Sequence, residues 1–215
     1  MKSFSSRTAF SAEMKDTLRD LLAQRALTTR KKVTLSTGRV SDFYLDCKLV
    51  TLSSDGASLI ADAFLDKLDL LPEPVTAVGG RTIGADPIVV AIMMRARERG
   101  RQLAGFYVRD KQKTHGTMEL IANAPASGAK VVIVDDVVTA GKSVIEAIDA
   151  AQAAGCIVVG VIVLVDRQEE SGEANIRARV PNYFAVYTRA DFPEISEADK
   201  CHTARSEPHS VGVSS

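Results

Sequence analysis

The sequence has few cysteines, no excess of charge and no long hydrophobic segment. Its three cysteines, Cys47, Cys156 and Cys201, are widely spaced and form no C-x-x-C pair, which argues against a zinc site or a redox pair. We therefore expect reduced thiols and a cytoplasmic location. The longest apolar run, Ile157 to Val165, is only as long as a strand, and the first ten residues lack the apolar block of a signal peptide. We expect no membrane association.

The charge balance argues against another class of partner. The 215 residues include 27 Lys and Arg and 27 Asp and Glu, so the formal net charge at pH 7 is zero. A general nucleic-acid binder carries a basic excess, so we expect no nucleic-acid partner. Any anion that the protein binds must then be held by local groups. A chain of this length buries roughly 70% of the surface that its unfolded form exposes, so its core needs neither disulfides nor a structural metal.

The N-terminal part of the chain reads as a helix, a pair of short strands and a second helix. Ser11 is expected to cap the first helix, whose apolar face reaches Leu27. The β-prone runs 33–35 and 43–47 are expected to form a hairpin or a pair of edge strands. The second helix is expected over residues 54–68, because its apolar residues recur at helical spacing.

From residue 72 onward, strand-like and helix-like segments alternate, which predicts βαβ units and an α/β fold with a parallel sheet. The expected strands cover residues 75–78, 103–108, 130–134, 157–165 and 182–187. The expected helices cover residues 86–99 and 142–154. Strands 130–134 and 157–165 are almost continuously apolar, as in strands that helices cover on both faces.

The sharpest candidate site follows the expected strand 130–134, since ligands of open parallel sheets bind at the carboxyl ends of the strands. Asp135 and Asp136 end this strand, and a loop, 137–141, leads into a helix at Lys142 and Ser143. Backbone N–H groups at a helix start can hold a phosphate, and paired carboxylates can accept hydrogen bonds from sugar hydroxyls. A Walker A loop is excluded because it needs a glycine at position 136. The pattern favours a sugar phosphate; alternatively, the two acids only end a strand and cap a turn.

A basic stretch follows the expected strand 103–108. Arg109, Lys111, Lys113 and His115 occupy alternate positions in a segment without large apolar residues, so an extended chain would place all four side chains on one side. Such a stretch can close as a lid over a second anionic group and stabilise charge on a leaving group. The alternative is a solvated basic loop.

Two other strand ends carry candidate groups. The glycine-rich turn 79–84 could hold a diphosphate through backbone N–H groups, although glycines also mark ordinary turns. Arg167 follows the expected strand 157–165 and could bind a planar carboxylate through two hydrogen bonds. The alternative for Arg167 is a surface ion pair with Asp166 or Glu169.

The run from Val131 to Ser143 resembles the phosphoribosyl pyrophosphate (PRPP) signature of the type I phosphoribosyltransferases. Within that group the chain resembles the orotate phosphoribosyltransferase family over about residues 14–192. The segments that match this family, in the same order along the chain, are 35–44, 78–87, 109–116 and 166–168.

This resemblance implies a fold, a reaction and an assembly. The fold is a parallel sheet flanked by helices, the core of residues 53–192, with a small hood from the N-terminal helix and strands of residues 11–52. Residues 1–10 would be a flexible N-terminus and residues 193–215 a poorly ordered tail. The reaction transfers ribose 5-phosphate from PRPP to N1 of orotate, giving orotidine 5′-monophosphate and pyrophosphate in pyrimidine synthesis, with Mg²⁺ carried mainly by PRPP. The assembly is a homodimer in which the lid reaches the neighbouring subunit's site.

Residue roles are implied by the same resemblance. Asp135 and Asp136 would bind the ribose hydroxyls, and the run from Thr139 to Ser143 the 5-phosphate. The residues implied in PRPP binding are Arg109, Lys111, Lys113, His115, Asp135, Asp136, Val137, Val138, Thr139, Ala140, Gly141, Lys142 and Ser143. Lys113, with Arg109 and His115, would stabilise the departing diphosphate. Those implied in orotate binding are Thr139, Arg167, Tyr44 and Leu45.

Three positions depart from the family pattern. Ser36, Ile83 and Asp110 stand where many members have lysine, and Lys111 could replace the lysine missing at 110. Two other functions compete with this one. A phosphoribosyltransferase for another base is disfavoured by the match of residues 166–168 and of the hood. A non-catalytic sensor of PRPP or a nucleotide would usually carry a nucleic-acid-binding element.

Overall fold

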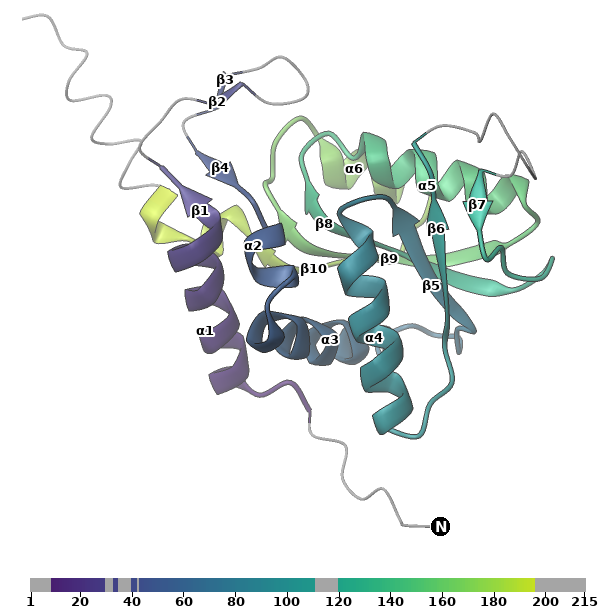
Figure 1. Cartoon of the computed structure of the whole chain (residues 1–215). Coiled ribbons are helices and arrows are strands. Elements are labelled where there is room, and N and C mark those ends of the chain that lie inside the picture. The colour runs from purple at the N-terminus through teal and green to yellow at the C-terminus, as the bar shows by residue number, and fades with distance from the viewer. Residues whose placement is uncertain (1–8, 30–32, 35–39, 42, 111–119, 196–215) are drawn as a thin grey trace, which may run out of the picture.

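The computed structural model describes residues 9–29, 33–34, 40–41, 43–110 and 120–195 and contains one six-stranded sheet between layers of helices (Figure 1). The strands of this sheet are β5 (Ala77–Arg81), β6 (Ala104–Val108), β7 (Ile121–Ala122), β8 (Lys130–Val138), β9 (Ile157–Asp166) and β10 (Tyr183–Thr188). Their order is β10-β9-β8-β5-β6-β7, and all neighbours are parallel except β6 and β7. The predicted parallel sheet is confirmed, and β7 adds an antiparallel edge that the sequence patterns did not indicate.

Helices cover both faces of the sheet because its central strands are apolar on both sides. The helices are α1 (Ala12–Leu21), α2 (Lys48–Thr51), α3 (Ser54–Leu68), α4 (Ala85–Glu98), α5 (Lys142–Ala153) and α6 (Gly172–Arg177), with a π-helix, η1 (Leu22–Ala26), and a 3-10 helix, η2 (Arg189–Asp191). Alternate residues of β8 point to opposite faces. Val132 and Val134 pack in the core that includes α1, α3 and α4, whereas Val131 and Ile133 pack in the core of α5 and α6.

The first helix begins as the sequence predicts but ends earlier. The Ser11 hydroxyl accepts a hydrogen bond from the Met14 N–H at 3.2 Å, which caps α1. After η1 the chain becomes extended at β1 (Leu27–Thr28), where Leu27 pairs with Leu45. The expectation that Leu27 lies on the helix is therefore wrong, because strand pairing takes over at this residue.

The short N-terminal strands form two separate pairs. The runs 33–35 and 43–47 were expected to form a hairpin or a pair of edge strands, but the two do not pair with each other: β2 (Val33–Thr34) pairs with β3 (Val40–Ser41). β4 (Tyr44–Leu45) instead pairs antiparallel with β1, the strand that follows the first helix. This pairing joins β4 to the end of the helical segment α1 and η1 and places both beside the sheet (Figure 1).

The end of β8 differs from the prediction in a way that matters for the candidate site. The sequence pattern placed the strand end at residue 134, but backbone pairing with β9 continues from Asp135, opposite Val163, to Val138, opposite Asp166. Both aspartates therefore lie within the strand, and the loop before α5 begins at Thr139. The hydrogen bond from the Arg167 N–H to the Val138 carbonyl, at 3.0 Å, ties the two strand ends together.

The other expected elements are confirmed with small shifts at their ends. The helices expected at 54–68, 86–99 and 142–154 correspond to α3, α4 and α5, and the strand expected at 75–78 begins two residues later as β5. Helix α6 was not expected.

Among the helices of the described residues, none combines the length and the hydrophobicity that a membrane span requires.

Candidate active site

The candidate site lies where neighbouring parallel strands end at one edge of the sheet. β9, β8 and β5 are adjacent in the sheet. Their C-terminal ends lead to Arg167, to the loop 139–141 and to the loop 82–84 respectively. The expectation that these separate sequence segments meet at the carboxyl edge is confirmed.

The two aspartates of β8 face the start of α4. A Cβ atom added at Gly84 would lie 2.5 Å from Asp136 Oδ1 and 2.9 Å from Asp135 Oδ1. Only glycine fits there without displacing the carboxylates. Asp135 is 5% exposed, and its Oδ2 accepts a 2.7 Å hydrogen bond from the Ser143 hydroxyl. The carboxylate pair is therefore enclosed by the starts of two helices, α4 and α5.

Burial makes both carboxylates harder to ionise. Burial, and then the neighbouring charge of Asp136, raise the pKa of Asp135 from 3.8 to about 7. Burial also raises the pKa of Asp136, whereas the positive charge of Lys48 acts in the opposite direction. Lys48 Nζ lies 2.8 Å from Asp46 Oδ1. Sequence reasoning missed Lys48, because only the packing of α2 brings it near the strand end.

The turn between β8 and α5 offers backbone donors for an anion. Gly141 has a φ of +79°, a left-handed conformation that favours glycine, and no side chain caps α5 among the described residues. The first N–H groups of α5 therefore have no partner within the helix. The Ser143 hydroxyl donates to Asp135, and the Lys142 side chain is exposed, 3.9 Å from Glu146.

The unexpected helix α6 packs against this turn and holds its position. A Cβ atom at Gly172 would lie 2.2 Å from the Thr139 carbonyl oxygen. The Asn175 amide donates a 3.1 Å hydrogen bond to the Ala140 carbonyl. Ile176 is fully buried and lies against Gly141. The position of the turn thus depends on a short helix that follows β9 in the chain.

The buried Arg167 side chain belongs to a group that also includes a carboxylate, a second guanidinium and an aromatic ring. Its side chain is 3% exposed, its Nη2 lies 3.2 Å from Glu169 Oε2, and its guanidinium lies 4.0 Å from the centre of the Phe43 ring. Arg189 approaches the same ring at 5.2 Å and the other oxygen of Glu169 at 3.3 Å. The ion pair with Glu169 that we considered as an alternative is present, but it is buried rather than on the surface.

Sequence reasoning did not select two members of this group, Phe43 and Arg189, and it considered Glu169 only as a surface partner of Arg167. Phe43, Glu169 and Arg189 come from the hood, the loop after β9 and η2. No motif connects them in the sequence, so only the fold reveals the group. Burial lowers the pKa of Arg167, while the charge of Glu169 acts in the opposite direction.

The two hood residues implied in base binding have different environments. Tyr44 is exposed, whereas the Leu45 side chain is buried in the hydrophobic core. The Leu45 side chain is therefore engaged in packing rather than directed to solvent. Of the hood residues that the structure describes, Phe43 is the one that contacts Arg167.

The basic lid lies mostly outside the described residues. Lys111, Lys113 and His115 fall in the segment 111–119, which the structure does not describe. Arg109 lies at the end of β6, where its N–H donates to the Leu120 carbonyl at 3.0 Å. The two ends of the segment are therefore adjacent.

Asp110, one of the departures from the family pattern, has a partner on the neighbouring strand. Its Oδ1 accepts a 2.8 Å hydrogen bond from Nε of Arg81, the last residue of β5. The Arg81 guanidinium also pairs with Glu146 of α5. The start of the lid segment is therefore attached to the strand that carries the loop 82–84.

No protein cage for a metal is found within the described ranges. These residues contain no group of three or more His, Cys, Asp or Glu side chains placed to hold a metal ion. The Asp135 and Asp136 carboxylates already accept hydrogen bonds from Ser143 and from backbone N–H groups.

Comparison with known proteins gives a consistent set of relatives. The family described as "Phosphoribosyl transferase domain" matches residues 84–187. The orotate phosphoribosyltransferase of Sorangium cellulosum is 38% identical over 187 residues, which cover 86% of this chain and 96% of that protein. The orotate phosphoribosyltransferase of Thermosynechococcus vestitus is 42% identical over 149 residues, which cover 69% of this chain and 77% of that protein.

A solved structure has the same fold and a bound ligand. The orotate phosphoribosyltransferase of Mycobacterium tuberculosis H37Rv in complex with PRPP superposes with a TM-score of 0.67 at 31% identity, covering 83% of this chain and 98% of that one. The α/β fold with a mostly parallel six-stranded sheet and a small N-terminal antiparallel sheet is therefore that of the phosphoribosyltransferases.

The raised pKa of Asp135 predicts that the protein becomes less stable as the pH rises. Between about pH 4 and pH 7 the folded chain keeps a proton that the unfolded chain releases, so the free energy of unfolding falls across this window. Asp135→Asn removes the ionising group and should raise the free energy of unfolding at pH 8 by about 1–3 kcal/mol. Urea unfolding at pH 5 and pH 8 measures both effects.

The control for this experiment is an exposed aspartate. Asp149 is half exposed and pairs with Arg179. The Asp149→Asn variant should show the same pH dependence of the free energy of unfolding as the unmodified chain. If Asp135→Asn had the same free energy of unfolding as the unmodified chain at both pH 5 and pH 8, the assigned cost of burying the Asp135 charge would be contradicted.

Proposed function

The chain belongs to the orotate phosphoribosyltransferase family, and from this premise we propose that Asp135 and Asp136 bind the ribose hydroxyls of PRPP. Its activity is the transfer of ribose 5-phosphate from PRPP to orotate in pyrimidine synthesis. In this reaction the bond from C1 of the ribose to the diphosphate breaks, and pyrophosphate leaves with the electron pair. A bond from C1 to N1 of orotate forms, and N1 loses its proton. Orotidine 5′-monophosphate results.

The observation that carries the residue assignment is the enclosed carboxylate pair at the end of β8. Ionised carboxylates only accept hydrogen bonds, which matches the donating hydroxyls of a ribose. Asp135 is held by Ser143, and both Oδ1 atoms face the start of α4 at Gly84. The two acids therefore have fixed positions before any substrate arrives, which reduces the entropy lost on binding.

The 5-phosphate of PRPP is proposed to bind the turn from Thr139 to Ser143. The N–H groups at the start of α5 point out of the helix, and the helix dipole favours an anion there. Gly141 allows the left-handed turn that exposes them. Among the residues that the resemblance assigned to PRPP, Val137 and Val138 belong to β8, and the Val137 N–H already donates to Asp136 at 2.8 Å.

Mg²⁺ is proposed to arrive with PRPP as part of the substrate. A magnesium ion usually keeps several waters and is shared between substrate phosphates and one or two carboxylates. The described site offers two such carboxylates, Asp135 and Asp136, close together on β8. The two acids would then bind the ribose hydroxyls beside the ion.

The lid is proposed to close over the diphosphate. Arg109, Lys111, Lys113 and His115 would bring positive charge to the leaving group, and Lys113 is proposed to stabilise it most directly. What supports this is the position of the segment: it leaves from β6, which pairs with β5, and returns at β7 on the other side of β6.

Orotate is proposed to bind between Arg167, Thr139 and the hood. A guanidinium can bind the orotate carboxylate through two hydrogen bonds, and Phe43 and Glu169 fix its plane. Arg167, Glu169 and Arg189 together carry one net positive charge, which an added carboxylate neutralises. Tyr44 is exposed and available to the base, whereas Leu45 would contribute through its backbone.

A homodimer with a shared lid is proposed, built on an apolar face beside the site. A cavity of about 630 Å³ between α2, α3 and α4 includes Lys48, Leu52, Ile83 and Met94. Leu52 is 73% exposed and Met94 63%, which is unusual for clustered apolar side chains. Because Ile83 belongs to the loop beside the carboxylates, a second copy seated here would bring its own residues near them.

The remaining expectations are also proposals. The core is proposed to cover residues 53–192 and the hood residues 11–52, with 1–10 and 193–215 as the ends of the chain; within these ends, Phe10 packs against the hydrophobic core and Ile195 is buried in it. A cytoplasmic location is proposed on the basis of the reduced, buried thiols of Cys47 and Cys156; Cys201 lies outside the described residues.

Changing Asp135 and Asp136 together to Asn should lower kcat/KM for PRPP by about 100-fold or more, because amides bring donors that face the ribose hydroxyls. The measurement is the loss of orotate near-ultraviolet absorbance on addition of PRPP and Mg²⁺. Asp149→Asn is the matched control and should retain full activity. A double variant with unchanged turnover and PRPP affinity would refute the assignment.

Replacing Arg167 by Lys should raise KM for orotate by about 10- to 100-fold, since one charge remains but the paired hydrogen bonds are lost. KM for PRPP should stay close to the value of the unmodified chain, which a general loss of structure would not produce. Arg179→Lys, an exposed arginine paired with Asp149, serves as the control. Equal increases in both KM values would rule out a specific orotate contact.

Met94→Glu should convert the homodimer to a monomer, because a carboxylate would be buried in an apolar interface. Sedimentation velocity should give twice 23.0 kDa for the unmodified chain and 23.0 kDa for the variant. Ile157→Glu, at a half-exposed residue on β9, should remain dimeric. A monomeric unmodified chain with full activity would disprove the shared lid.

A further inference from the structure

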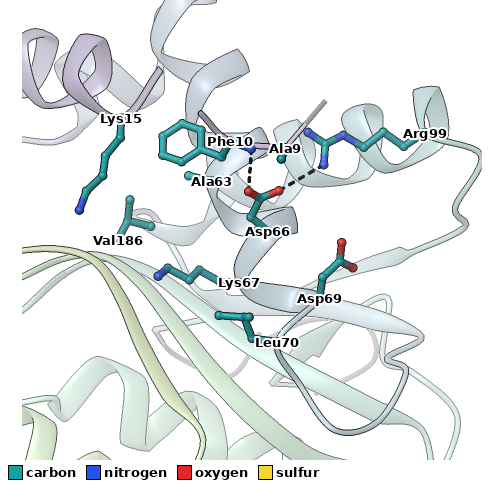
Figure 2. Close-up of a pocket in the computed structure, with 10 residues that line it drawn as sticks. All are labelled: Ala9, Phe10, Lys15, Ala63, Asp66, Lys67, Asp69, Leu70, Arg99 and Val186. Atoms are coloured by element: carbon teal, nitrogen blue, oxygen red, sulfur yellow. Dashed lines mark hydrogen bonds and ion pairs between the residues drawn. The ribbon is translucent and has the colours of Figure 1, made fainter. Parts of the chain in front are cut away.

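A second cavity lies between α1, α3, α4 and β10, apart from the strand-end site. It has a volume of about 470 Å³ and is lined by ten residues (Figure 2). None of them belongs to the candidate active site. The volume falls within the usual range of small-molecule pockets. Ala9, Phe10 and Lys15 at the start of α1 line the cavity, and this end of α1 lies away from β2 and β3 of the hood (Figure 1).

Two lysines bring unpaired positive charge to this cavity. Lys15 comes from α1 and Lys67 from the last turn of α3, and both side chains line the cavity together with Val186 (Figure 2). Neither pairs with a carboxylate of any residue that the structure describes. The Lys15 ammonium lies 5.7 Å from the centre of the Tyr187 ring. Because both lysines line one cavity, an anion bound in it would be attracted by two positive charges.

The carboxylates of the cavity are already occupied. Asp66 accepts a 2.6 Å hydrogen bond from the Phe10 N–H and lies 3.7 Å from the Arg99 guanidinium (Figure 2). Asp69 pairs with Arg101 at 2.7 Å. These acids therefore do not neutralise the two lysines, although their remaining lone pairs can accept hydrogen bonds from hydroxyls.

Apolar groups complete the cavity. The Phe10 ring lies over Ala63, and Leu70 and Val186 form further apolar walls (Figure 2). A ligand that suits this arrangement has an anionic end for the two lysines, a flat ring for the Phe10 side and hydroxyls for the two aspartates. A phosphate with two negative charges matches two ammonium groups better than a carboxylate does.

We propose that this cavity is a second binding site, which takes a nucleoside monophosphate with its phosphate between Lys15 and Lys67. The site is independent of the proposed PRPP and orotate contacts. A ligand held there would connect α1 to α3. Because α1 continues through η1 into β1 of the hood, occupancy would restrain the segment that carries the hood.

Equilibrium dialysis with uridine 5′-monophosphate as the probe tests the proposal, with the protein saturated with PRPP and Mg²⁺ so that the active site is filled. The unmodified chain should bind one further molecule of the probe per chain. Lys15→Ala with Lys67→Ala should weaken this binding at least about tenfold, as should Lys67→Glu alone. Uridine, which lacks the phosphate, should bind at least about tenfold more weakly to the unmodified chain.

The matched control is Lys130→Ala, a lysine at the start of β8 that pairs with Glu73. It should bind the probe as the unmodified chain does, and thermal unfolding verifies that each variant is folded. Absence of saturable binding, equal affinity in the double variant, or equal affinity for uridine would each overturn the proposal. Failure of the proposed activity would appear instead as absent orotate turnover, with the dependence of probe binding on the two lysines unchanged.

Discussion

The site depends on the continuation of backbone pairing between β8 and β9 past the apolar part of both strands. Pairing as far as Val138 and Asp166 carries Asp135 into the protein, where it is 5% exposed. The same pairing places Arg167 beside the end of β8 through the bond to the Val138 carbonyl. One ladder of hydrogen bonds therefore sets the distance between the residues proposed to hold the sugar and the base.

Groups of opposite charge, two carboxylates and one guanidinium, are buried at this edge of the sheet. The carboxylates of Asp135 and Asp136 are enclosed by helix starts and carry raised pKa values. Arg167 is as deeply buried, but Glu169 and the Phe43 ring contact its guanidinium. The proposed binding of an anionic donor and an anionic acceptor by a chain with zero net charge thus relies on local groups rather than on a general field.

The supports of the site come from parts of the chain that lie far from it in sequence. Helix α6 holds the turn 139–141, and the hood contributes Phe43 to the arginine group. The positive charge of Lys48 in α2 opposes the rise in the pKa of Asp136. Changes in these elements should therefore alter substrate binding although they lie outside the PRPP signature.

Sequence patterns by themselves determined the alternating strands and helices, the acidic pair that follows an apolar run, the glycine-rich turn and the family resemblance, because each depends on neighbours within a few residues. Tertiary structure decided the end of β8, the pairing of β4 with β1, and the burial of Arg167 with Glu169, Arg189 and Phe43. These features depend on contacts between distant segments, and a ladder continues wherever a partner strand is present. No local pattern identifies the partner strand. The roles of α6 and Lys48 were missed for a related reason, because they too depend on contacts between segments that are distant in sequence.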